Sequence, residues 1–509
     1  TSRPAWSYRY DQAGRLVAET DFNGRTLTYE HDAAGRLVSR TNGADETLRF
    51  TRDARGRVVE QHDDSGEVTT YAYGPDGRMS RAANADAEIV LDRDAVGRIL
   101  SETVGGRTTT FTYDAVGQCT HRVAPSGLVS DWTYDPVGHP VELRSAAGSL
   151  AFSYDAVGRE TERRIGDAAT LTQSWSATGH LAVQSLTSTA DSSEADRLLQ
   201  HRSYAYRADG YLVEVRELTS GTRRFDLDAM GRVTGVRAHG WREVYAYDAA
   251  GSPVRATAPD HACPGDREFE GTLVRRAGHT VYEHDAQGRL VRRTRKLLNG
   301  QSRTWTYAWD TEDRLTEAVT PDGERWRYAY DPLGRRVSKH RVAEDGTQAD
   351  RVDFSWDDTR LAEQTCQDGR VTTWDYAPGS HRPVAQTQHK TSVVESGASF
   401  LARLAEETDS SYTTRFHAVV TDLVGTPAEL VSVSGDLVWQ RRTSLGALAC
   451  RLRRTRKPPW TARYASPAST PTPRRDSATT TSALTTPRPD DTSLQTRWAS
   501  YPPPITTPT

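Results

Sequence analysis

Residues 10–17 read Tyr10-Asp11-Gln12-Ala13-Gly14-Arg15-Leu16-Val17, and this stretch decides the fold because the chain keeps repeating it. The glycine of the motif recurs at positions 14, 35, 56, 77, 97, 117, 138, 158, 179, 210, 231, 251, 288 and 334. Most intervals are 20 or 21 residues, and self-similarity at a fixed period of this length is the signature of a repeat architecture. The chain is therefore expected to be an array of similar units rather than a set of unrelated globular domains.

Each residue type in the motif has a physical role. The aspartate is expected to accept hydrogen bonds from backbone amides two residues on, the glycine to supply a positive φ, and the aromatic ring to pack against the neighbouring unit beneath an arginine. We assign these structural roles to Tyr10, Asp11, Gly14, Arg15, Asp32, Gly35, Arg36, Tyr113, Asp114, Gly117, Tyr154, Asp155, Gly158, Arg159, Tyr330, Asp331, Gly334 and Arg335.

Between two motifs the sequence predicts one β-hairpin. Residues 15–21 form a strand-like run that leads to Asn23-Gly24, a dipeptide suited to a two-residue hairpin turn, and residues 25–29 then alternate with the period of a strand. Later copies carry the same signal, for example at Asn42-Gly43 and Ser126-Gly127. The predicted fold class is therefore all-β, built from repeated hairpins of about 21 residues.

Composition favours a thin, wet sheet over a globule with a thick core. Of the 509 residues, 36% are hydrophobic and 26% are charged, which is little apolar material for a thick core. The chain also carries 21 Tyr and 12 Trp, and this aromatic content is too high for a disordered protein. The net charge of −3 gives no general reason to expect nucleic acid or an anionic membrane as a partner. No apolar run reaches membrane-spanning length and no signal peptide opens the chain.

Catalytic and metal-binding patterns are weak. Cys119, Cys263, Cys366 and Cys450 are far apart, without the close pairs of a zinc site. His261 stands near Cys263, but two candidate ligands in a polar segment make a poor metal site. One aspartate per repeat does not make a calcium loop, and the arginines of the motif each have an aspartate nearby. We therefore expect no catalytic residue, no cofactor and no metal.

The chain divides into three predicted regions. Residues 1–379 carry the hairpin repeats, although the intervals between Gly179 and Gly210 and between Gly251 and Gly288 are longer and are expected to hold polar loops. Residues 380–445 leave the period. Residues 446–509 contain 11 of the 24 prolines, with ten basic residues against three aspartates, a composition typical of a disordered tail.

The motif and its period resemble the RHS or YD-repeat family, which includes bacterial polymorphic-toxin scaffolds, shells of insecticidal toxin complexes and teneurin-like YD shells. A core-end segment similar to that of the family follows the repeats, with a valine beside the glycine where the family usually has leucine; its residues are Asp422, Gly425, Thr426, Pro427, Glu429, Leu430 and Trp439. The resemblance implies a β-ribbon that spirals into a hollow shell. In complete members the shell encloses a C-terminal effector that an aspartate-dependent cleavage releases.

The tail departs from the family pattern. Permitted synonymous codons of residues 463–470 can spell Leu-Arg-Phe-Pro-Gly-Gln-Tyr in a shifted frame, and those of residues 495–500 can spell Asp-Pro-Leu-Gly-Leu, strings similar to the end of the family core. We therefore expect residues 446–509 to be an out-of-frame translation. Because the first repeat is already under way at Tyr10, the chain is also expected to be a fragment.

Two functional hypotheses follow. The first is a structural fragment of a toxin shell, whose partners in a complete homologue are a C-terminal effector and its immunity protein. The alternative is a repeat-based module that binds a carbohydrate or a cell-surface receptor. The resemblance implies a secreted or cell-surface location, without membrane insertion. A shell predicts one continuous spiralling sheet with mainly polar inner walls, whereas a binding module predicts an exposed row of aromatic rings.

Overall fold

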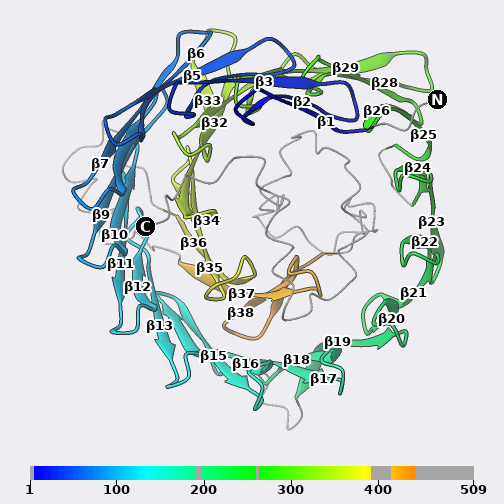
Figure 1. The fold of residues 1–509 in the computed structure, drawn as a ribbon. Helices are drawn as coiled ribbons and strands as arrows, with labels where there is room; N and C mark the ends of the chain where they lie inside the picture. Colours follow the sequence, from blue (N-terminus) through cyan, green and yellow to red (C-terminus); the bar gives the residue numbers. More distant parts are fainter. Residues whose placement is uncertain (1–4, 190–195, 259–262, 391–413, 442–509) are drawn as a thin grey trace.

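The computed structural model describes residues 5–189, 196–258, 263–390 and 414–441, and every regular element in these ranges is a β-strand. Each strand pairs antiparallel with the next one along the chain, from β1 to β39. The strands follow one another around a ring and then continue into a second, partial turn (Figure 1). The all-β spiral of hairpins predicted from the repeats is thus confirmed. Residues 446–509, predicted as a disordered or out-of-frame tail, lie outside the described residues.

The first circuit of the spiral comprises β1 (Ser7–Tyr10), β2 (Leu16–Thr20), β3 (Thr26–His31), β4 (Leu37–Thr41), β5 (Thr47–Arg52), β6 (Val58–Asp63), β7 (Val68–Tyr73), β8 (Met79–Ala83), β9 (Glu88–Arg93), β10 (Ile99–Val104), β11 (Arg107–Tyr113), β12 (Cys119–Val123), β13 (Val129–Tyr134), β14 (Pro140–Ser145), β15 (Gly148–Tyr154), β16 (Glu160–Ile165), β17 (Ala169–Trp175), β18 (Leu181–Ser188), β19 (Arg197–Tyr206), β20 (Leu212–Glu217), β21 (Gly221–Leu227), β22 (Val233–Ala238), β23 (Trp241–Tyr247), β24 (Pro253–Thr257) and β25 (Gly265–Glu270).

The second circuit comprises β26 (Leu273–Ala277), β27 (Thr280–His284), β28 (Leu290–Lys296), β29 (Ser302–Trp309), β30 (Leu315–Val319), β31 (Arg325–Tyr330), β32 (Arg336–Val342), β33 (Gln348–Asp357), β34 (Arg360–Cys366), β35 (Arg370–Tyr376), β36 (Pro383–Lys390), β37 (Arg415–Thr421), β38 (Pro427–Ser432) and β39 (Leu437–Gln440).

In the longer intervals the strands reach the edges of the predicted loops, whose central residues, 190–195 and 259–262, lie outside the described residues. Between Gly179 and Gly210 the chain forms the long strands β18 and β19, so Thr187 and Ser188 are paired in the sheet. Between Gly251 and Gly288 it forms an additional hairpin, β25–β26. Both segments are polar, and polarity alone does not separate a loop from a strand whose side chains face water. His261 lies outside the described residues.

The hairpin turns also differ from the prediction. At Asn23-Gly24 the turn is a five-residue frame that begins at Asp21 and places φ of Gly24 at +79°, the geometry of the motif itself. At Asn42-Gly43 the residue with positive φ is Asp45, at +61°, not the glycine. The two-residue turn expected from these dipeptides is therefore wrong, because an aspartate or asparagine at the start of the frame caps the longer turn.

Strand alternation divides the sheet into two faces. Tyr29 lies directly opposite Arg40 on the neighbouring strand, and Arg40 lies opposite Leu48 on the strand after that. Pairs of this kind can be followed from strand to strand through the first circuit as far as Leu143 and Leu150. Since directly opposed residues point to the same side, all of them share one face. The last hairpins, β36–β38, pack on this face and lie inside the ring (Figure 1), so it is the inner face. It mixes aromatic, aliphatic and charged side chains and is not mainly polar.

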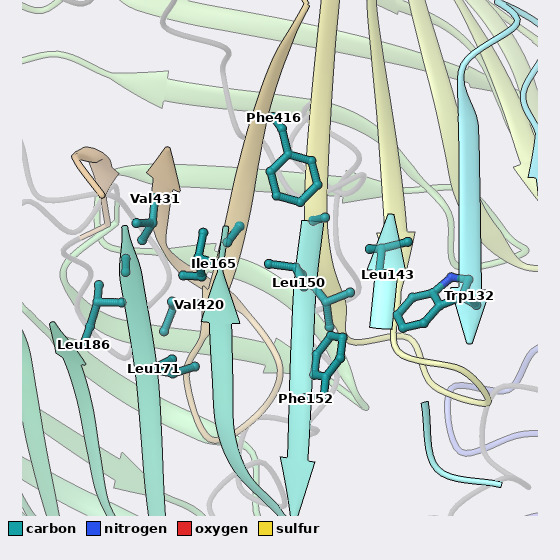
Figure 2. Packing of buried hydrophobic residues seen from close by; sticks show 14 residues of the cluster. Trp132, Leu143, Leu150, Phe152, Ile165, Leu171, Leu186, Phe416, Val420 and Val431 are labelled. Carbon is teal, nitrogen blue, oxygen red and sulfur yellow. The ribbon is translucent and has the colours of Figure 1, made fainter. Parts of the chain in front are cut away.

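The largest apolar core lies where the spiral overlaps itself. Leu150, Ile165 and Leu171 of the first circuit pack against Phe416 and Val420 of the second (Figure 2). These strands form two layers, and several of their side chains have no exposed surface. Smaller cores surround Tyr328 and Tyr330 and, elsewhere, Val236. Apolar packing between the two circuits is thus concentrated where β36–β38 cover the first circuit. Elsewhere other contacts hold the circuits together.

Candidate functional site

The turn at residues 155–159 shows how the repeated motif works. The Asp155 carboxylate accepts hydrogen bonds from the backbone N–H of Val157 (3.1 Å) and of Arg159 (2.9 Å), and from Nε of Arg159 (2.7 Å). The backbone N–H of Gly158 donates to the Asp155 carbonyl, which requires φ of +81° at the glycine. The hydrogen bond from the Arg159 backbone, followed by that from its side chain, holds the pKa of Asp155 below its usual value.

The arginine and the aromatic ring of the motif connect successive repeats. Arg98 lies over the ring of Tyr113, 5.0 Å from its centroid, and Nη1 donates to the carbonyl of Asp114. The Tyr113 hydroxyl donates to the carbonyl of Ile99 (2.9 Å), and burial raises the pKa of this tyrosine to about 12. Each motif is therefore tied to the preceding one by a ring, a cation and two hydrogen bonds.

These contacts recur at most motif positions. The aspartate caps the turn at Asp11, Asp32, Asp114 and Asp331, and a positive φ occurs at Gly14, Gly35, Gly117 and Gly334. The ring hydroxyl reaches the preceding repeat from Tyr154 and Tyr330. Tyr10 differs: it is exposed in the first strand. The array thus has a repeated connection that begins after its first strand.

A second set of contacts joins the two circuits, and we call it the joint. It brings the five-residue turns of the first circuit at 42–46 and 63–67 and the four-residue turn at 84–87 against the motif turns of the second at 285–289, 310–314 and 331–335. Joined residues are 221–258 positions apart in the sequence. One turn of the spiral therefore takes about twelve repeats of 20 or 21 residues.

Ion pairs carry much of the joint. Both Nη atoms of Arg289 donate to the Glu46 carboxylate, at 2.8 and 3.0 Å, while its Nε donates to Asp285 of its own turn. Arg335 likewise binds Asp331 of its turn and Glu102 of the first circuit (2.6 Å). The Gly43 N–H donates to the Gln287 side chain (2.7 Å). The motif arginine therefore has two functions in the second circuit, where it caps its turn and holds the adjacent circuit.

The core-end segment closes the joint with a buried charge cluster. Glu429 has no exposed surface and receives Arg202 of β19, with Nη1 at 3.0 Å and a second contact from Nη2. Gln200 and Gln440 also donate to Glu429. Burial by itself lowers the pKa of Arg202, but the neighbouring Glu429 charge outweighs this effect and the pKa is raised.

The remaining core-end residues form an ordinary hairpin. Asp422 caps its turn through the N–H groups of Val424 and Thr426, and Gly425 has φ of +80°. Pro427 begins β38, and Leu430 pairs with Trp439 of β39. Desolvation raises the pKa of Asp422, opposite to the shift at Asp155, although the Asp422 side chain remains exposed.

Sequence reasoning identified the turn residues but missed the partners across the joint. Glu102 and Arg202 belong to no repeated pattern, and the partners of all three residues, Glu46 included, lie more than 220 positions away in the sequence. A signal existed for Glu46, since it is the fifth residue of a turn frame, as the motif arginine is in its own. Nothing comparable pointed to Arg202.

The described residues contain no metal site and no membrane-spanning helix. In the part of the chain that the structure describes, no three His, Cys, Asp or Glu side chains are arranged to hold a metal ion. The described cysteines Cys119, Cys263 and Cys366 form no disulfide with one another. Among these residues there is no helix that could cross a membrane.

Comparison with known proteins places the repeat motif in a family. The RHS Repeat family matches residues 10–47, 52–89, 93–129, 113–150 and 309–348. The chain is 28% identical to "Probable deoxyribonuclease RhsB" of Dickeya dadantii over 383 residues, which is 70% of this chain and 24% of the relative. It is 28% identical to "Toxin protein Tse5" of Pseudomonas aeruginosa, over 73% of this chain and 31% of that protein. The chain thus spans about a quarter to a third of these relatives.

Solved structures show the same fold. The crystal structure of TcdB2-TccC3 superposes with a TM-score of 0.58 at 11% identity, covering 86% of this chain and 25% of the other. A Tc holotoxin pore of Photorhabdus luminescens gives a TM-score of 0.59 at 12% identity, covering 86% and 24%. At this identity the likeness concerns the fold alone.

Proposed function

Because this chain is an RHS-repeat protein, we propose that it forms part of a toxin shell that encloses a C-terminal effector and delivers it. One observation carries the proposal: a single antiparallel sheet spirals past its own start, and the joint then ties successive circuits together. A sheet of this kind leaves few free strand edges along its length, so it is a wall rather than an open array.

The toxin names of the relatives support this proposal. RhsB and Tse5 are about two to three times as long as this chain, so their activities belong to proteins of which only a part is matched. We assign to this chain the structural role alone. The effector, its immunity protein and export from a bacterial cell belong to the complete protein that the proposal implies.

The mixed inner face suits a wall that holds a polypeptide. Tyr29, Phe50 and Tyr71 are half-buried on the inner face of the early strands, between Arg40 and Gln61. Such a surface offers weak apolar and polar contacts to many sequences without a single specific pocket. It replaces the mainly polar wall that we expected for a shell.

The alternative, a binding module for carbohydrates, depends on exposed rings. Most motif rings are covered by an arginine or a histidine and use their polar atom within the sheet, so they do not present a free face. An exposed aromatic group does exist at the first strand, where Trp6 packs edge-on against Phe22 and parallel to Tyr8. Among the described residues, a glycan site would therefore be confined to this group.

Protease protection tests the shell. A flexible reporter peptide with one cleavage site is fused after Thr509 of the full chain, and its cleavage is timed beside the same peptide fused to an unrelated soluble protein. Enclosure predicts slower cleavage, on the order of tenfold or more, and loss of that protection when Glu429→Ala weakens the joint. Equal cleavage rates in all three proteins would contradict the proposal. Binding on a glycan array that Trp6→Ala abolishes would favour the alternative.

A further inference from the structure

The inner face of the second circuit carries a group of basic side chains across strands β28 to β32. We call this group the basic wall, defined by Arg293, Arg295, Arg303, Lys339 and Arg341. The row of directly opposed residues that marks the inner face in the first circuit continues along the sheet and reaches Arg295 and Arg303. Lys339 and Arg341 share this face, because their cross-strand partners pack with Tyr307, which stands on the Arg303 side of β29.

The outer face of the same strands is neutralised within the sheet. Arg292 lies opposite Glu283, with 3.6 Å between their charged groups. Glu317 contacts both Arg325 (3.4 Å) and Arg327 (3.2 Å). Each of these outer arginines therefore has a carboxylate beside it.

The basic wall is neutralised only in part. Arg303 and Arg341 contact Asp322 and Asp350, but Arg295, which is exposed, forms no ion pair with a described carboxylate. Arg295 and Arg303 lie directly opposite each other on β28 and β29, and like charges in this arrangement destabilise a sheet. The stability of the fold gives no reason for such a pair, whereas a ligand of opposite charge would account for it.

Aromatic rings hold two further cations of the wall. The Arg293 guanidinium lies over Trp305, 4.4 Å from the ring centroid, and the Lys339 ammonium lies 5.7 Å from the ring centroid of Trp326. Both rings also pack against the apolar cluster around Tyr307. A nucleic-acid base stacks on an uncovered ring face and would meet a cation here instead. A cation over a ring keeps its charge, so the arrangement suits carboxylates better than bases.

We propose that the basic wall binds an acidic, extended segment of a polypeptide. Neighbouring strands lie about 4.8 Å apart, so the wall is about 20 Å wide from β28 to β32, a length that about six extended residues span. The segment is rich in aspartate or glutamate, since the charge that the wall leaves uncompensated is positive. The inference deepens the proposed function, on which it rests for the source of the segment, namely the enclosed effector.

Binding of a labelled hexaglutamate peptide to the full chain tests the proposal, with hexaglutamine as the neutral control. The peptide is added to the folded chain and, in a second sample, is present while the chain refolds from denaturant, so access to the inner face does not depend on an open ring. Fluorescence anisotropy should show that hexaglutamate binds, that salt weakens this binding by screening the charges, and that hexaglutamine does not bind. Absence of hexaglutamate binding in both samples would overturn the proposal.

Two double variants locate the binding surface. Arg295→Gln/Arg303→Gln removes two charges from the wall and a contact between like charges, so the variant should fold normally and bind hexaglutamate more weakly, on the order of tenfold or more. The matched control Arg325→Gln/Arg327→Gln removes two charges from the outer face and leaves the affinity unchanged. Circular dichroism and thermal unfolding show that both variants are folded. Equal losses of affinity in the two variants would overturn the proposal, because binding would then follow overall charge.

The remaining outcomes separate the basic wall from other ligands and from the shell itself. A thymidine hexanucleotide that binds as tightly as hexaglutamate would overturn the assignment to a polypeptide. Hexaglutamate binding together with an unprotected reporter after Thr509 would contradict enclosure and leave the basic wall in place. A protected reporter without hexaglutamate binding would contradict the basic wall alone.

Discussion

Strands β13–β18, which the last hairpins cover, and strands β1–β7, whose described contacts with the second circuit lie at the turns, share one repeat but differ in burial. Leu150 and Leu27 stand at the same position of the repeat, four residues before the motif ring. Leu150 has no exposed surface, whereas Leu27 is only half-buried. The repeat therefore determines the hairpin, and the overlap of the spiral determines how much each hairpin contributes to stability.

The two regions also use charge differently. Arg202 of β19 and Glu429 of β38, next to the covered region, are buried together, while Arg81 of β8 and Glu88 of β9, just beyond the early strands, form an ion pair in solvent on the outer face. A buried pair is costly to break because one charge remains without its partner, and an exposed pair contributes little. Substitutions in the two regions can therefore measure how much burial adds to the stability of each.

Glu429→Ala is expected to have the largest effect. It leaves the buried Arg202 guanidinium with Glu217 as its remaining carboxylate, so the cost in the free energy of unfolding lies near the lower end of about 3–5 kcal/mol. The matched change Glu88→Ala removes the exposed pair and costs about 0–1 kcal/mol. Denaturant unfolding measures both. The double variant Arg202→Met/Glu429→Leu should regain much of the loss, and failure to regain any would mean that the pair has a role beyond neutralising its own charges.

Leu150→Ala should have the second largest effect on the free energy of unfolding. Removing a fully buried leucine from the two-layer core costs about 2–5 kcal/mol, because a cavity remains between the layers. Leu27→Ala, at the same repeat position in the single layer, should cost about 1 kcal/mol, since part of that side chain is already in water. Equal losses at the two positions would show that the covering hairpins do not add to the core in solution.

The hairpin repeat and the all-β fold could be read from the sequence because their causes are local. An aspartate that caps a turn, a glycine with positive φ and a ring beneath an arginine all act within one or two repeats, as the turn at Asp155–Arg159 shows. The pairing of Glu46 with Arg289 could not be read, because it depends on how many repeats complete one circuit. That number follows from the small twist and curvature of each hairpin, which the motif does not encode in any single residue.

Two glycines offer a finer comparison. Gly24 has φ of +79° with open space where a Cβ would stand, so Gly24→Ala strains only its own turn, by about 1–2 kcal/mol. Gly43 lacks a positive φ, but a Cβ there would lie 2.8 Å from the Ala286 carbonyl across the joint. Gly43→Ala should therefore speed hydrogen exchange of amides in the turn at 285–289, which Gly24→Ala leaves unchanged. Faster exchange in both variants would contradict the separate causes.

The pH dependence of stability should show the smallest effect per residue. Hydrogen bonds from the motif arginine lower the folded pKa of Asp11, Asp32 and Asp155, so these turns gain stability that is present above the unfolded value near 3.8 and is lost as pH falls through the lower folded values. Asp422 shifts in the opposite direction, because desolvation raises its pKa and its turn is favoured when it is protonated. Hydrogen exchange measured from pH 5 to pH 3, a window of about two units around the unfolded pKa, should therefore show the exposed turns of the first circuit opening on acidification, while the turn at Asp422 keeps its protection. Amide exchange has its own pH dependence, so each turn is compared with an unstructured peptide of the same sequence. The opposite order of opening would contradict the opposite pKa shifts of these aspartates, which are chemically the same group in different surroundings.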